Sequence, residues 1–126
     1  MIDHLRRQLE GRPEILCAYL HGSFLKGDPY RDIDVAVWVD PTRRGARSRA
    51  QYALDLSVAL HVALRCPVDV QVLNDAPLAF RYHALNGHPL VVRDWEWLDE
   101  VRARIWDDYF DFAPFARQYL REALGA

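Results

Sequence analysis

The sequence has few of the features that mark a secreted, membrane-spanning or strongly charged protein. Its two cysteines, Cys17 and Cys66, are too few for a disulfide framework, and no Cys/His spacing fits a zinc site. No apolar run approaches the length that spans a bilayer, and the charged start of the chain lacks the apolar segment of a secretory signal. With 16 basic and 18 acidic residues, the net charge of −2 gives no overall attraction to nucleic acid or membranes. We therefore expect a cytoplasmic protein with reduced thiols that binds neither nucleic acid nor a membrane directly.

What the chain does have is the size and composition of one small globular domain. It holds 126 residues, of which 51% are hydrophobic, far more than a disordered chain contains. It shows no internal repeats, linkers or low-complexity segments. We therefore expect a single domain over residues 1–126, which ends in an aromatic-rich helical segment at about residues 95–124.

The spacing of apolar residues predicts the mixed α/β (α+β) class, with a small mixed sheet of three to four strands flanked by helices. The expected helices cover residues 2–10, 43 or 47 to 65, 78–85 and 95–124, and the expected strands cover residues 14–21, 33–39, 68–73 and 90–92. Thr42 is expected to cap the second helix. Pro114 is expected to begin a separate last helix, with Asp111 as its cap.

The residues with the most suggestive chemistry lie in one stretch, HGSFLKGDPYRDIDVAVWV over residues 21–39. An apolar strand feeds into Gly22 and Ser23, a polar loop follows, and Asp32 and Asp34 open the next strand. Because side chains alternate across a strand, these two carboxylates are expected to lie on the same face.

This combination predicts a site for a metal ion and a nucleotide. Two neighbouring carboxylates repel each other unless a cation lies between them, and Mg²⁺ is usually held by one or two carboxylates plus substrate phosphates. Gly22 lets the backbone approach a phosphate closely, and Ser23 offers a hydroxyl beside free backbone N–H groups. A lone D-x-D or Gly-Ser pair is a weak signal, and a strand bordered by two exposed aspartates is the plain alternative. It is the joint pattern that favours a site.

The order Gly22-Ser23, Gly27, Asp32-Ile33-Asp34 resembles the signature of the nucleotidyltransferase superfamily related to DNA polymerase β. The short chain is similar to the minimal nucleotidyltransferases of prokaryotes, which are often antitoxin partners of HEPN-domain toxins. The resemblance implies a polymerase β-like nucleotidyltransferase fold over most of the chain. The loop over residues 24–31 is shorter than in many members of the family, which affects the nucleotide contacts of the loop more than the metal ligands.

The resemblance also implies three catalytic carboxylates that hold two Mg²⁺ ions. Two of them are Asp32 and Asp34, and the third lies on a later strand, where Asp69 matches. Asp69 sits in a Val-rich strand and faces away from its valines, which is costly without a partner or a cation. Asp75 is the competing candidate, but it follows the strand end beside Pro77, where helix capping explains it.

Further residues near this stretch have both a functional and an ordinary explanation. By the resemblance, Gly22, Ser23 and Lys26 bind the phosphates of ATP, although an exposed lysine needs no function. His21 precedes the turn and is more simply a strand-end residue than a nucleotide contact. The basic start of the second helix is more simply a solvated face than a phosphate or partner contact; it contains Arg43, Arg44, Arg47 and Arg49.

For the acceptor, the resemblance implies a tyrosine hydroxyl on a HEPN-domain toxin, which receives AMP from ATP and is thereby neutralised. The chain shows no second domain for a small-molecule acceptor, so the partner is expected to complete the site. The aromatic residues of segment 95–124 either form the surface on which this partner docks or pack in the hydrophobic core against the sheet. Two alternatives remain: a small-molecule nucleotidyltransferase of the aminoglycoside-modifying type, and an antitoxin that acts by binding alone.

Overall fold

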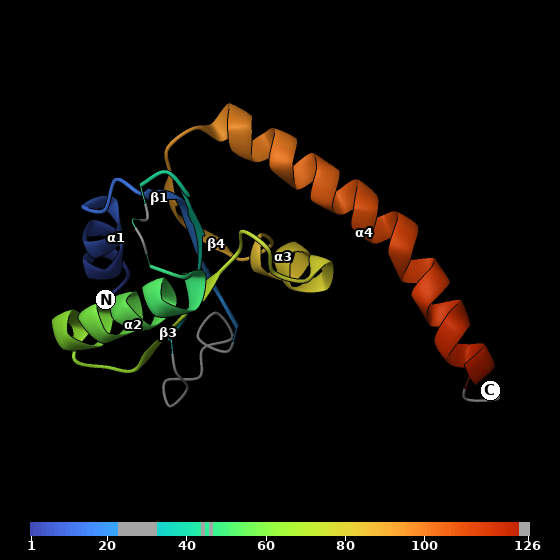
Figure 1. The fold of residues 1–126 in the computed structure, drawn as a ribbon, viewed down its shortest axis with the longest axis horizontal. Coiled ribbons are helices and arrows are strands. Elements are labelled where there is room, and N and C mark those ends of the chain that lie inside the picture. The colour runs from blue at the N-terminus through green and yellow to red at the C-terminus, as the bar shows by residue number, and fades with distance from the viewer. Residues whose placement is uncertain (23–32, 44, 46, 124–126) are drawn as a thin grey trace.

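The computed structural model of the chain describes residues 1–22, 33–43, 45 and 47–123. Helices and strands follow one another along these residues in the order that the sequence predicts, with two successive strands after the first helix (Figure 1). Their bounds are α1 Ile2–Glu10, β1 Ile15–His21, β2 Ile33–Val39, α2 Arg49–Leu64, β3 Val68–Val72, α3 Leu78–Ala84, β4 His88–Val92 and α4 Trp95–Ala123. The expected fourth strand is present and begins two residues earlier than expected.

The strands form one mixed sheet in the order β3-β2-β1-β4. β1 pairs antiparallel with both β2 and β4, whereas β2 and β3 are parallel. A parallel pair needs a crossover connection, and α2 supplies it between β2 and β3. The predicted mixed sheet of three to four strands with flanking helices is therefore confirmed.

Helices cover the two faces of the sheet separately. α1 and α2 pack on one face, and α3 with the first half of α4 packs on the other (Figure 1). Alternation along β2 and β3 sends their valines toward α1 and α2, and it sends the residues between them to the opposite face. Asp69 therefore faces away from the valines of its strand, as the sequence predicts.

The start of α2 differs from the expectation. The helix begins at Arg49 and is capped by Ser48, whose hydroxyl accepts a hydrogen bond from the Gln51 N–H at 3.1 Å. Thr42 does not cap it, because its backbone N–H and hydroxyl both donate to the Asp40 carboxylate, at 2.9 and 2.8 Å. Either residue type can cap a helix, so local sequence does not separate them.

Arg93, just after β4, fixes the start of β1. Its guanidinium donates hydrogen bonds to the carbonyl oxygens of Ile15, Glu10 and Arg12, at 3.1, 2.8 and 3.0 Å. A guanidinium has five donors in a rigid fork, which suits several carbonyls at once. Arg93 thereby holds the end of α1 close to the first residue of β1, the strand that leads to Gly22.

α4 is one continuous helix, with Pro114 inside it, so the expected break at Pro114 is wrong. A proline inside a helix removes one hydrogen bond, here the one to the carbonyl of Phe110. Phe110 is exposed, so water can reach this part of the helix, and exposed helices tolerate such a site by curving. The first half of α4 packs on the sheet, and the second half extends away from it (Figure 1).

Candidate active site

Three polar residues lie side by side on the neighbouring strands β1, β2 and β3, near one end of each strand. His21 at the end of β1 pairs with Asp34 of β2, and Asp34 pairs with Asp69 of β3. Residues in register on neighbouring strands point to the same face of a sheet. This is the face that α3 and α4 cover, opposite to the valines of β2 and β3. We call His21, Asp34 and Asp69 the polar row.

Asp34 and Asp69 bring two carboxylates to adjacent positions on parallel strands. Neighbouring strands lie about 4.8 Å apart, so the side chains of a register pair are close. Asp34 is half-buried and Asp69 is exposed. Like charges placed this closely repel, and a cation that takes oxygen ligands relieves the repulsion. The two carboxylates therefore fit a Mg²⁺ ion in donor type and in proximity.

Gly22 fits tightly against Asp34. Its φ is +80°, in the left-handed region that favours glycine. A Cβ atom at Gly22 would collide with the carboxylate of Asp34, so only a residue without a side chain leaves that carboxylate in place. The Gly turn and the acidic strand, which the sequence predicts to cooperate, are in direct contact.

His21 lies beside the two carboxylates in the polar row, although the sequence pattern favours an ordinary strand-end residue there. Its ring meets Phe80 of α3 edge-on, with ring centroids 5.5 Å apart. Its Nε2 is buried and has no hydrogen-bond partner among the residues that the structure describes. Burial lowers the pKa of His21, while the nearby charges of Asp34 and Asp69 act to raise it. A strand-end histidine next to a glycine turn is the sequence signal that could have found it.

The two candidates for the third carboxylate have different surroundings in the structure. Asp75 forms an ion pair with Arg49 at the start of α2 and is exposed. It does not cap α3, because Pro77 is the N-cap and no side chain bonds to that end. Asp69, in contrast, lies in the polar row. The structure thus places Asp69 beside Asp34 and gives Asp75 an ionic partner of its own.

Three further candidates, Ser23, Lys26 and Asp32, lie outside the described residues. In the described part of the chain, no cluster of three or more His, Cys, Asp or Glu side chains is arranged to hold a metal ion. No helix in that part is both long and apolar enough to cross a membrane.

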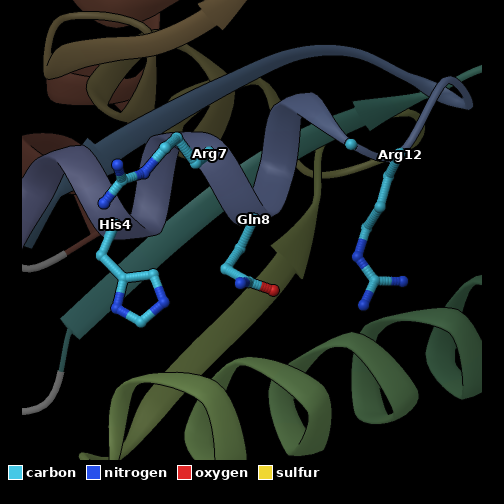
Figure 2. Close-up of a pocket in the computed structure, with 5 residues that line it drawn as sticks. His4, Arg7, Gln8 and Arg12 are labelled. Atoms are coloured by element: carbon cyan, nitrogen blue, oxygen red, sulfur yellow. The ribbon is translucent and has the colours of Figure 1, made fainter.

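A separate surface hollow lies along α1, on the other side of the sheet. Its lining is His4, Arg7, Gln8, Gly11 and Arg12, and Figure 2 shows His4, Gln8 and Arg12 directed toward α2. This lining offers guanidinium and imidazole groups but no carboxylate, so it cannot supply the metal ligands that the polar row can.

The sequence of residues 3–96 matches the family model described as Polymerase beta, Nucleotidyltransferase, which covers well over half of the chain. The chain therefore belongs to this nucleotidyltransferase family, and the resemblance in its sequence to polymerase β-like enzymes is confirmed. No curated protein matches the sequence significantly.

Solved structures share the whole fold. The chain is similar to one in a crystal structure of a mutant MntA–HpeT toxin–antitoxin, at 19% identity and a TM-score of 0.76 over 100% of this chain and 99% of the other. It is also similar to a chain in a toxin–antitoxin crystal structure with AMP-PNP, at 22% identity and a TM-score of 0.74 over 99% of this chain and 98% of the other. A third similar chain comes from a structure of a tri-AMPylated Shewanella oneidensis HEPN toxin in complex with an MNT antitoxin. Its identity is 19% and its TM-score is 0.71, over 99% of this chain and 97% of the other.

Proposed function

We propose that this protein is the antitoxin of a HEPN/MNT pair and a Mg²⁺-dependent nucleotidyltransferase that moves AMP from ATP to a tyrosine hydroxyl of its HEPN-domain toxin. The observation that carries the proposal is the register pair of Asp34 and Asp69, with Gly22 against the Asp34 carboxylate, in a chain of nucleotidyltransferase fold. This arrangement suits a nucleotide whose phosphates bring a divalent cation with them.

The solved structures support both halves of the proposal. One similar chain comes from a toxin–antitoxin structure with AMP-PNP, an ATP analogue, and another from a complex in which the HEPN toxin is tri-AMPylated. Both alignments extend over 99% of this chain, so the comparison includes the long last helix as well as the sheet. We extend the nucleotide and the partner from those proteins to this one as a proposal.

The residues that would hold Mg²⁺ are Asp34, Asp69 and Asp32, the last of which precedes β2. When bound there, Mg²⁺ would neutralise charge on the phosphates and lower the pKa of the attacking hydroxyl. Two ions can share these three carboxylates.

The residues of the chain would act on the bound nucleotide and the acceptor. Gly22 would leave room for the phosphates at the end of β1, and Ser23 and Lys26 would bind them. The tyrosine oxygen of the toxin would bond to the α-phosphorus, the bond to the β-phosphate oxygen would break, and pyrophosphate would leave. Asp69 is exposed at the edge of the sheet, so its carboxylate can accept the hydroxyl proton.

The proposal is tested by transfer of label from α-labelled ATP to the HEPN-domain protein encoded beside this chain. Asp34→Asn and Asp69→Asn are expected to reduce the rate at least about 100-fold, because each removes a metal ligand. Asp75→Asn is the matched control, since this aspartate follows the same strand as Asp69 but pairs with Arg49, and it is expected to keep the wild-type rate within about twofold.

Three outcomes contradict parts of the proposal. Full transfer by Asp34→Asn would remove the catalytic assignment. Complete protection of cells by an Asp34→Asn antitoxin that no longer transfers AMP would instead support neutralisation by binding alone. Transfer of AMP to an aminoglycoside but not to the toxin would place the protein among small-molecule nucleotidyltransferases.

A further inference from the structure

The second half of α4 presents large aromatic side chains to solvent. We call residues 110–123 the α4 arm. Phe110, Phe112, Phe115 and Tyr119 are 60, 54, 68 and 64% exposed. Figure 1 shows the arm pointing away from the sheet, so that its end lies far from the other elements. Scattered apolar residues on a surface are common, but four large aromatics within ten residues of one helix indicate an interaction surface.

The two halves of the helix are used differently. Leu98 and Ile105 in the first half are buried against the sheet, at 0 and 5% exposure. In the arm, Phe112, Phe115 and Tyr119 recur at spacings of three and four, which places them along one side of the helix. The arm therefore has the stripe of a helix that packs against another element, although in the described part of the chain this stripe is exposed to solvent.

The charges of the arm bear on the class of protein or surface that it binds. Asp111 and Glu122 are acidic, and Arg117 and Arg121 are basic, so the arm has no net charge. It therefore offers no net attraction to the phosphates of nucleic acid or to the anionic surface of a membrane. A protein with an apolar helical face suits the stripe, since aromatic residues are enriched in the cores of protein interfaces.

Aromatic contacts connect the arm with the candidate active site. Tyr82 of α3 stacks on Tyr109 at 3.9 Å between ring centroids and meets Phe110 edge-on at 5.8 Å. Phe80 of the same short helix meets the ring of His21 in the polar row. α3 thus connects the base of the arm with the polar row through aromatic contacts on both of its sides.

We propose that the α4 arm is the surface on which the HEPN-domain toxin docks, with an apolar face of the toxin packed on Phe112, Phe115 and Tyr119. This inference rests on the proposed function, and it names where on this chain the acceptor protein is held. A stable interface buries about 800 Å² on each partner, and a large aromatic side chain can bury about 150–250 Å². The exposed aromatics of the arm supply a large part of that area.

The test compares two variants of the 126-residue chain. Phe115→Ser with Tyr119→Ser removes the aromatics of the arm that lie furthest from the sheet. Val62→Ser is the control, because this α2 side chain is 73% exposed and α2 packs on the opposite face of the sheet. Circular dichroism confirms that each variant is folded.

The measurement is the steady-state rate of AMP transfer to the adjacent HEPN-domain protein as a function of its concentration, together with its Kd by calorimetry. The arm variant is expected to raise KM and Kd at least about tenfold with kcat within about twofold, whereas the α2 control keeps all three. An unchanged Kd in the arm variant, or an equal rise in the α2 control, would overturn the docking proposal.

Two further outcomes separate the docking proposal from the catalytic one and from self-association. If Asp34→Asn retains transfer but the arm variant loses binding, the catalytic proposal fails and the docking surface stands. If wild-type sedimentation shows a dimer that the arm variant loses, and toxin binding is unchanged, the arm is an interface between copies of this chain and the docking proposal is wrong.

Discussion

Asp34 and Asp69 occupy opposite register positions on parallel strands, one half-buried and the other exposed. Nothing in the pattern of a sheet requires two acids there, and their mutual repulsion is unfavourable without a cation. The residues on either side of each aspartate pack into the core on the other face: Ile33 and Val35 beside Asp34, and Val68 and Val70 beside Asp69. Neither strand can therefore shift by one residue without burying its carboxylate. The register that builds the core therefore also holds the carboxylates together.

Asp69→Asn is expected to stabilise the metal-free protein by about 0.2–1 kcal/mol, because it removes one of two like charges in register. Saturating Mg²⁺ is expected to raise the Tm of the wild type and to raise that of Asp69→Asn less. Thermal unfolding in EDTA and in Mg²⁺ measures both effects. Asp75→Asn serves as the control, and an equal response of Asp69→Asn and wild type to Mg²⁺ would argue against a metal at this pair.

Gly22→Ala is expected to destabilise the fold by about 1–3 kcal/mol and to weaken nucleotide binding, because it combines a positive φ with a collision against the Asp34 carboxylate. Gly45 has the same φ of +80° but open space where a Cβ atom would lie, so Gly45→Ala bears the backbone strain alone. Urea unfolding and titration with an ATP analogue measure the two variants. Similar losses of affinity in both would contradict a specific role for Gly22.

The lowered pKa of His21 is expected to make the free energy of unfolding depend on pH. Burial lowers its pKa in the folded state below the ordinary value of 6.5, so the unfolded state binds the proton more readily. The stability that depends on neutral His21 is fully present above about pH 6.5 and is lost as the pH falls through the lower, folded-state pKa. His21→Gln is expected to flatten this part of the profile, and His88→Gln, at an exposed position, is expected to keep it. The measurement is the denaturant midpoint of the wild type and both variants between about pH 5 and 8 in EDTA. An unchanged pH profile in His21→Gln would contradict the prediction.

Tyr52 connects α2 with the start of β1. Its hydroxyl donates a hydrogen bond of 2.7 Å to the Glu14 carboxylate, and the side chain is buried. Tyr52→Phe is expected to cost about 1–3 kcal/mol, because it removes a hydrogen bond to a charged group. The exposed Tyr119→Phe is expected to change the free energy of unfolding by less than about 0.5 kcal/mol. If chemical denaturation gives equal values for the two variants, the Tyr52 bond contributes nothing measurable.

Much of this fold could be predicted from the sequence because its signals are local. The helical period of Ile2–Glu10, the apolar run before Gly22 and the alternation of Val68–Val72 each correspond to an observed element. The pairing of Asp34 with Asp69 could not be derived from spacing alone, since it depends on which strands become neighbours. It came from the family resemblance, and the strand register agrees with it.

The errors lie where two local rules compete or where tertiary packing decides. Ser48 and Thr42 are both good caps, and the choice between them depends on a hydrogen bond of Thr42 to Asp40. Pro114 signals a break, but the helix continues through it. Similarly, the aromatics of segment 95–124 divide into core and exposed groups according to where the sheet ends, which no periodicity specifies.

The most direct test of the central claim is the intact mass of the protein encoded beside this chain, after incubation with this protein, ATP and Mg²⁺. We predict an increase by one or more AMP units on a tyrosine, which fragmentation locates, and no increase with Asp34→Asn or Asp69→Asn. An unchanged mass in the presence of a stable complex of the two proteins would contradict the claim that this chain is a protein adenylyltransferase.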